Sequence, residues 1–157
     1  MTPRVAVQAE DFDVAAALAA LDADGVGGIA SFIGVVRGGD ALTALTLEHY
    51  PGMTERALTR LADEAATRWP LSGCVILHRI GRLPVGARIV LVATASAHRA
   101  AALEACAYLI DQLKTRAPFW KAEEFADGTR RWVAARESDE NAATAWVNNL
   151  PPRTDGL

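Results

Sequence analysis

The chain has 157 residues, of which 51% are hydrophobic and 22% charged, and its formal net charge is −3. These values fit one globular domain with a core of its own and exclude a disordered or fibrous chain. The acidic balance argues against nucleic-acid binding, and the lack of a signal peptide or a long apolar run favours a cytoplasmic protein without a membrane span.

The first part of the chain is predicted to alternate between strands and helices. In chain order we expect a strand over 3–9, a helix over 14–21, strands over 29–36 and 42–50, and a helix over 53–69. The run 29–36 is apolar and β-branched, which predicts a buried strand. A glycine-rich turn separates it from 42–50, so we expect the two strands to form a hairpin with Arg37 at its tip or edge.

The second part continues the same mixture. It is predicted to contain strands over 74–80 and 88–95, a helix from 98 to about 116, strands over 119–125 and 131–134, and a short helix to about 147. Ser96 is predicted to cap the long helix, and Ser138 or Asp139 the last one. Paired strands dominate over regular βαβ units in this order, which predicts an α+β fold. Residues 1–150 are expected to form the single domain, and 151–157 a flexible tail.

The basic residues are unevenly composed, with 14 arginines and only two lysines, Lys114 and Lys121. Arginine supplies charge, but only lysine supplies an amine that can become neutral and reactive. The end of the long helix, Pro118 and the next strand could bring the two amines together, so that one of them acts as a nucleophile or base. The alternative is two solvated lysines beside a core formed by Phe119 and Trp120.

A second group of polar residues opens the long helix. His98 and Arg99 follow a strand and begin this helix, where free backbone N–H groups favour an anion. The alternative is a surface pair without a ligand. Arg37 in its glycine-rich turn is a further anion-binding candidate, and the arginines near the C-terminus could extend a positive pocket; they are Arg130, Arg131 and Arg136.

No metal site, disulfide framework or cofactor is predicted. The three histidines lack the spacing of metal ligands. Cys74 and Cys106 stand 32 residues apart and belong to no CxxC motif.

Six segments of the chain together resemble the large, catalytic subunit of molybdopterin synthase. They are LTLEHYPGMTE (45–55), RWPL (68–71), HRIGRL (78–83), SAHR (96–99), LKTRAPFWK (113–121) and RWVAARESD (131–139). The resemblance runs in order from about residue 3 to residue 147, and its longest segments are the most specific.

The resemblance implies a fold, a reaction and partners. The fold is α+β, with a hammerhead-like mixed sheet, hairpins and packed helices. The enzyme is a sulfurtransferase that adds two sulfurs to cyclic pyranopterin monophosphate and forms the dithiolene of molybdopterin. The sulfur arrives as a thiocarboxylate at the C-terminal Gly-Gly of a small ubiquitin-like subunit. Two large subunits form a central homodimer, and one small subunit docks at each end to give a heterotetramer.

The resemblance also implies the site residues. They are catalytic Lys114 and Lys121, and substrate-binding Arg37, His98, Arg99, Arg136 and Phe32. This family builds part of the pocket across the dimer interface, so Arg37, His98 and Arg99 are expected to serve a neighbour's lysines. Lys121 would activate the acyl group or transfer a proton at the pterin, and Lys114 would hold the tail carboxylate or form a transient covalent adduct.

Two other classes of function fit the same residues. A binding module could use the arginines to hold a phosphorylated ligand without chemistry. A lysine-dependent Schiff-base enzyme could act alone, without a partner protein.

Overall fold

The structure is a computed structural model that describes residues 1–133 and 137–148, so the predicted tail at 151–157 lies outside it. The described residues form four helices and two four-stranded sheets, which confirms the predicted α+β fold. The elements are β1 (Arg4–Gln8), α1 (Val14–Ala19), β2 (Gly28–Val35), β3 (Leu42–His49), α2 (Met53–Arg68), β4 (Leu71–Arg79), β5 (Gly81–Pro84), β6 (Arg88–Ser96), α3 (Arg99–Arg116), β7 (Phe119–Phe125), β8 (Arg130–Val133) and α4 (Glu137–Asn148).

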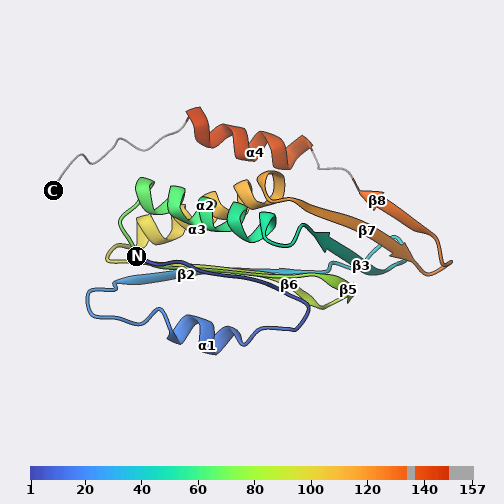
Figure 1. Ribbon diagram of the computed structural model, residues 1–157, viewed down its shortest axis with the longest axis horizontal. Coiled ribbons are helices and arrows are strands. Elements are labelled where there is room, and N and C mark those ends of the chain that lie inside the picture. The colour runs from blue at the N-terminus through green and yellow to red at the C-terminus, as the bar shows by residue number, and fades with distance from the viewer. Residues whose placement is uncertain (134–136, 149–157) are drawn as a thin grey trace.

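The first sheet has the strand order β1-β4-β6-β2 and carries helices on both faces (Figure 1). The core between this sheet and helices α2 and α3 includes Leu58, Leu61, Ile76 and Leu109, each at most 1% exposed. Burying one such side chain contributes about 1.5–3 kcal/mol. A smaller core lies on the opposite face, where α1 packs against the sheet. This packing fixes the sheet and α3 as one rigid support.

The second sheet has the strand order β5-β3-β7-β8 and lies at the end of the helices, where α3 gives way to β7 (Figure 1). It has its own small core, in which Val36, Leu45, Leu47 and Leu83 are buried together. Only Ala117 and Pro118 separate α3 from β7. The last turn of α3 and the start of the second sheet are therefore held side by side.

The predicted hairpin between 29–36 and 42–50 is wrong. β2 pairs antiparallel with β6, whereas β3 pairs with β5 and β7 in the other sheet. The chain crosses between the sheets at Val36, whose side chain is buried in the core of the second sheet. Its backbone N–H donates to the carbonyl oxygen of Ala87 at 2.8 Å. Pairing with strands far along the sequence therefore prevails over pairing across the local turn.

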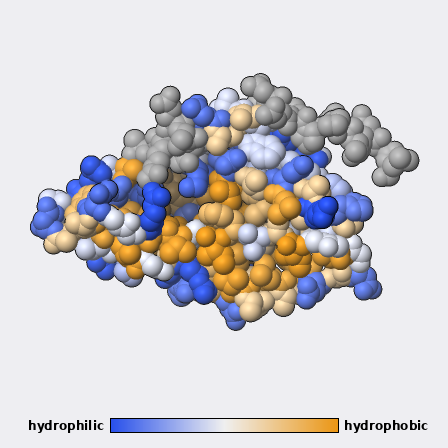
Figure 2. Space-filling model, turned by 180° about the vertical axis from the view of Figure 1, so that it is seen from behind, coloured by the Kyte–Doolittle hydropathy of each residue, from blue (hydrophilic) through white to orange (hydrophobic). Residues whose placement is uncertain are grey.

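The prediction of a buried strand at 29–36 is also wrong, because β2 is an edge strand. Its apolar side chains remain between 36% and 49% exposed at Ile29, Phe32, Ile33 and Val35. The face of the molecule shown in Figure 2 carries a broad apolar area. An apolar edge strand is a surface that proteins normally cover or blunt.

The remaining differences concern a short strand and two helix starts. β5 was not predicted, since its four residues follow β4 almost directly and end in a proline. The predicted cap Ser96 donates its hydroxyl to the carbonyl oxygen of Pro70 at 2.9 Å, and His98 is the N-cap of α3 instead. α4 begins at Glu137, ahead of both residues predicted to cap it.

Candidate active site

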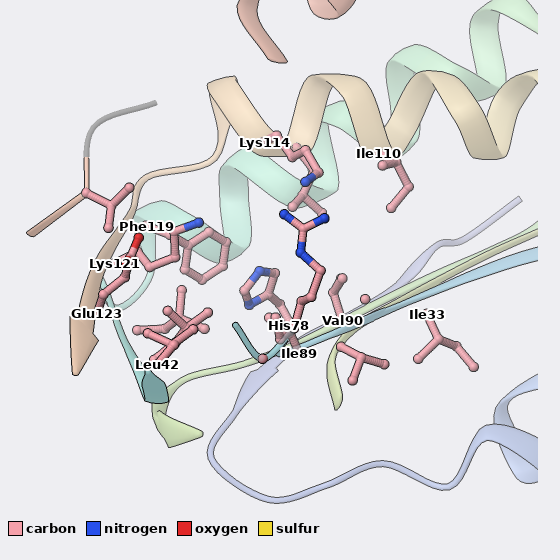
Figure 3. A pocket seen from close by; sticks show the side chains of 18 of the residues that line it. Ile33, Leu42, His78, Ile89, Val90, Ile110, Lys114, Phe119, Lys121 and Glu123 are labelled. Carbon is pink, nitrogen blue, oxygen red and sulfur yellow. The ribbon is translucent and has the colours of Figure 1, made fainter. Parts of the chain in front are cut away.

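A pocket of about 630 Å³ lies where the two sheets meet the end of α3 (Figure 3). Its walls come from β2 and the loop that follows it, from β3, β7 and β8, and from the last turns of α3. Much of this wall is apolar and includes Leu47, Ile89, Ile110 and Phe119. A pocket of this size and character suits a small organic molecule.

Lys114 and Lys121 reach into this pocket from two different elements (Figure 3). Lys114 is exposed in the last turn of α3, where the helix dipole favours a cation. Lys121 is half-buried in β7, which pairs with β3 on one side and β8 on the other. The helix end, the proline and the strand start therefore bring the only two lysines of the chain to one cavity.

The pocket lining has an excess of positive charge. It includes the cations Arg37, Lys114, Lys121 and Arg131, and the carboxylates Asp40 and Glu123. Arg131 forms an ion pair with Glu123 at 3.3 Å. Because the whole chain has a net charge of −3, this local excess is a specific feature of the pocket and favours an anionic ligand.

Two of the other predicted site residues share this pocket. Phe32 and Arg37 both line it, together with the lysines of their own chain. Arg37 therefore lies beside the lysines of its own chain, and its expected service to a neighbour's lysines stays a prediction. Phe32 is 40% exposed at the edge of the first sheet, so it forms an apolar rim. Arg136 lies outside the described residues.

His98 and Arg99 do not share the pocket. Both are exposed at the start of α3, at the opposite end of this helix from Lys114. At 1.5 Å per residue the helix separates Arg99 from Lys114 by about 22 Å. Within one chain these two residues therefore cannot act on a ligand that touches both lysines.

His78 is the site residue that the sequence did not reveal. It lines the pocket near the end of β4, and its ring stacks on that of Phe119 with centroids 3.8 Å apart. Burial lowers the pKa of His78 to about 4, so the ring is neutral near pH 7. A histidine within a strand more often has a structural role, so the sequence alone does not mark His78. The alternation of β4 places His78 on the same face as Ile76 and so toward the helices.

The described residues contain no group of His, Cys, Asp and Glu side chains arranged to hold a metal ion. In the same part of the chain, no helix has the length and apolar character that a membrane crossing requires.

Comparison with known proteins identifies relatives over most of the chain. A profile of the family described as MoaE protein matches residues 7–116. The chain is 52% identical over 154 residues to a protein of Mesorhizobium japonicum named molybdopterin synthase catalytic subunit. That alignment covers 95% of this chain and 96% of the relative.

The fold is shared with solved structures. Molybdopterin cofactor biosynthesis protein E from Burkholderia multivorans superposes with a TM-score of 0.81 at 46% identity, covering 94% of this chain and 98% of that one. A chain from a Helicobacter pylori structure, described as a complex of subunits 1 and 2 of molybdopterin-converting factor, has a TM-score of 0.69 at 21% identity. It covers 87% of this chain and 92% of its own, and it shares the fold. With a matching profile, a relative at 52% identity and the same fold, the chain belongs to the MoaE protein family.

Proposed function

We propose that the chain is the catalytic subunit of a molybdopterin synthase, a sulfurtransferase of molybdenum cofactor biosynthesis. The observation that carries this proposal is the meeting of Lys114 and Lys121, the only lysines of the chain, in one positively charged pocket. A relative that is 52% identical bears the same name. The proposed reaction adds two sulfur atoms to cyclic pyranopterin monophosphate and forms the dithiolene of molybdopterin.

Both reactants of this transfer are anions. The pterin carries a phosphate, and the sulfur donor is a thiocarboxylate at the C-terminus of a small ubiquitin-like partner. The thiocarboxylate sulfur forms a bond to a carbon of the pterin while the C–O bond of that carbon breaks and its oxygen leaves with a proton. Water then cleaves the acyl–sulfur bond, which leaves a thiol on the pterin and a carboxylate on the partner. Four cations against two carboxylates reduce the repulsion between these anions.

The positions of the two lysines suggest different roles. Lys121 is half-buried in β7, where water is partly excluded, so we assign it proton transfer or activation of the acyl group. Lys114 is exposed on the last turn of α3, so we assign it to hold the carboxylate of the incoming tail. Arg37 would bind the phosphate, and Phe32 would contact the apolar part of the substrate.

A second copy of the chain would bring His98 and Arg99 to the pocket. The outer edge of β2 is unpaired within the described residues, and several of its apolar side chains are exposed. Strand edges of this kind pair readily with another strand. We therefore include a homodimer in the proposal, with β2 at its interface.

The geometry of β2 explains why such a dimer would complete the site. Arg99 lies against the start of β2, since a Cβ added to Gly28 would stand 3.3 Å from the Cα of Arg99. The other end of β2, at Val35, lines the pocket. In an antiparallel pair of β2 strands, the Gly28 end of one copy lies beside the Val35 end of the other. Arg99 and His98 of one copy would then approach the lysines of the other.

We also propose a small-subunit partner and a cytoplasmic location. The Helicobacter pylori structure is described as a complex of two subunits, which supports a small-subunit partner and, with the homodimer, a heterotetramer. Cys74 and Cys106 are both buried and free, as is usual for proteins of a reducing compartment, which supports a cytoplasmic location.

The test is formation of molybdopterin by the purified chain from cyclic pyranopterin monophosphate, with and without thiocarboxylated partner. We expect product only when the thiocarboxylated partner is present. A binding module would hold the pterin and form no product in either case. A Schiff-base enzyme acting alone would convert the pterin without the partner.

A further inference from the structure

His78 lies in the pocket with both lysines and has no part in the transfer described above (Figure 3). It is only 5% exposed, which is unusual for a titratable side chain. It occupies the next-to-last position of β4, on the same face as Cys74 and Ile76, which pack into the core. The alternation of β4 therefore places the imidazole ring of His78 where the core borders the pocket.

The hydrogen bond of Nδ1 fixes which ring nitrogen carries the proton. Nδ1 lies 2.8 Å from the backbone carbonyl oxygen of Arg79, and a carbonyl oxygen can only accept. Nδ1 is therefore the donor. Since burial keeps the ring neutral near pH 7, Nε2 is left unprotonated and can only accept a hydrogen bond.

Nε2 is available to a ligand. Within the part of the chain that the structure describes, the hydrogen bond of His78 is made through Nδ1. Among the described residues, Nε of Arg68 is the only side-chain nitrogen or oxygen that is buried from solvent and lacks a hydrogen-bond partner. Nε2 of His78 is not an inaccessible, unpartnered atom of this kind, and the residue lines the pocket.

The orientation of the ring is fixed relative to Lys121. The rings of His78 and Phe119 stack with an interplanar angle of 18° and centroids 3.8 Å apart. Phe119 begins β7, and Lys121 stands two residues later on the same face of that strand. The acceptor and the amine are therefore positioned by the same strand.

The side chains that line this pocket offer few hydrogen-bond acceptors. Lysine and arginine side chains only donate hydrogen bonds, and of the two carboxylates Glu123 is already paired with Arg131. A pterin offers ring N–H and amino groups that need acceptors, besides the phosphate that needs donors. Resting on the proposed function, we propose that Nε2 of His78 accepts a hydrogen bond from an N–H group of the pterin and so positions the heterocycle beside Lys121.

The direct test observes the nitrogen atom itself. The chain contains three histidines, and ¹⁵N labelling of histidine gives their ring signals by NMR, with His78→Gln assigning those of His78. When cyclic pyranopterin monophosphate is added, we expect the Nε2 signal of wild-type His78 to move upfield as it accepts a hydrogen bond. His49, which does not line this pocket, is expected to keep its signals. Bound substrate with an unmoved Nε2 signal would overturn the proposal.

Variants provide a second readout. His78→Phe keeps a ring to stack on Phe119 but has no acceptor, so the KM for the pterin should rise about 3- to 10-fold while kcat changes less. His78→Gln offers a side-chain oxygen and should recover most of the loss. His49→Phe is the matched control and should leave KM unchanged. An unchanged KM in His78→Phe would overturn the assignment.

The two proposals fail in different ways. Wild-type protein that neither binds nor converts the pterin would overturn the proposed function, and the assignment of His78 with it. Wild-type protein that binds and converts the pterin, while the His78 signals and the KM of His78→Phe stay unchanged, would overturn the assignment of His78 alone.

Discussion

The hydroxyl of Thr54 donates a hydrogen bond to the carbonyl oxygen of Pro118 across 3.1 Å and so ties the first turn of α2 to the turn between the two lysines. The same oxygen of Thr54 accepts a hydrogen bond from the backbone N–H of Tyr50 at 3.0 Å. Thr54 is fully buried. A residue more than sixty positions away in the sequence therefore fixes how β7 leaves α3.

Replacing Thr54 with valine tests this link, because valine has nearly the same volume and no hydroxyl. The carbonyl of Pro118 and the N–H of Tyr50 would lose their partner, and an unsatisfied buried group costs about 1–3 kcal/mol. We expect the free energy of unfolding to fall by about 2 kcal/mol in urea titrations. We also expect turnover of the folded protein to fall, because Lys121 moves relative to Lys114.

Thr43→Val is the matched control for this prediction. The hydroxyl of Thr43 also donates to a backbone carbonyl oxygen, that of Glu124 at 3.1 Å, but at an exposed position. The free energy of unfolding should therefore change by less than about 0.5 kcal/mol. If Thr54→Val retains full turnover, the link does not position the lysines.

Replacing Lys121 with arginine should abolish most product formation while the fold and the partner complex remain intact. Arginine keeps the charge but cannot supply a neutral amine, since its pKa exceeds about 12. A group that transfers a proton contributes about 10²- to 10⁴-fold to the rate. Single-turnover sulfur transfer from the thiocarboxylated partner measures the loss.

Lys114→Arg provides the comparison, because the chain has no other lysine. If Lys114 binds the tail carboxylate, arginine can replace it and the rate should fall much less than in Lys121→Arg. A near-normal rate in Lys121→Arg would mean that this position requires only charge, and its catalytic assignment would then be withdrawn.

Local sequence patterns predicted most elements but not how the strands pair. Helix α2 followed from the spacing of its apolar residues, and β4 and β6 from their apolar runs. The partners of β2 and β3 did not follow, because the burial of Val36 between Leu45 and Leu83 depends on contacts far along the chain. Strand pairing of this kind is decided by the whole core, which a local turn does not reveal.

Part of the candidate site followed from the sequence. A helix end, a proline and a strand start could bring the two lysines together, and both line one pocket. Their catalytic roles stay predictions. His78 was missed because its role depends on which neighbour its ring meets, and Phe119 is about forty residues away. The separation of Arg99 from Lys114, by contrast, follows from the length of α3, which the predicted helix from 98 to about 116 matches closely.

Protonation of His78 should weaken the fold below neutral pH. Folding lowers its pKa from the usual 6.5 to about 4, mainly through burial, so between these values the unfolded chain binds a proton that the folded chain does not. The stability that neutral His78 contributes is therefore complete above pH 6.5 and is lost as the pH falls toward 4. At pH 4.5 the loss is roughly 2–3 kcal/mol by the linkage relation.

Urea unfolding of wild type and His78→Gln at pH 7 and pH 4.5 measures this contribution. Glutamine does not titrate, so the wild type should lose roughly 2–3 kcal/mol more than the variant between the two pH values. Groups that do not interact with His78 titrate alike in both proteins and cancel in the difference, whereas the charge of His49 acts on His78 and adds to it. Equal losses in the two proteins would show that His78 is not neutral and buried in the folded state.

The proposed homodimer predicts that two defective variants restore each other. Arg99→Ala should weaken substrate binding, since a charge-assisted hydrogen bond contributes about 1.5–3 kcal/mol. Lys121→Arg should remove the chemistry. In a mixed dimer, the intact Lys121 of one copy would meet the intact Arg99 of the other and form one complete site.

Random exchange of the two variants should therefore restore about one quarter of the wild-type activity at substrate concentrations below KM, because half of the dimers are mixed and each has one complete site. Unfolding and refolding the two variants together provides the exchange, and refolding each alone is the control. If Arg99 served the lysines of its own chain, every site in the mixture would carry one defect and no activity would return. A chain that sediments as a stable monomer at micromolar concentration would also contradict the shared site.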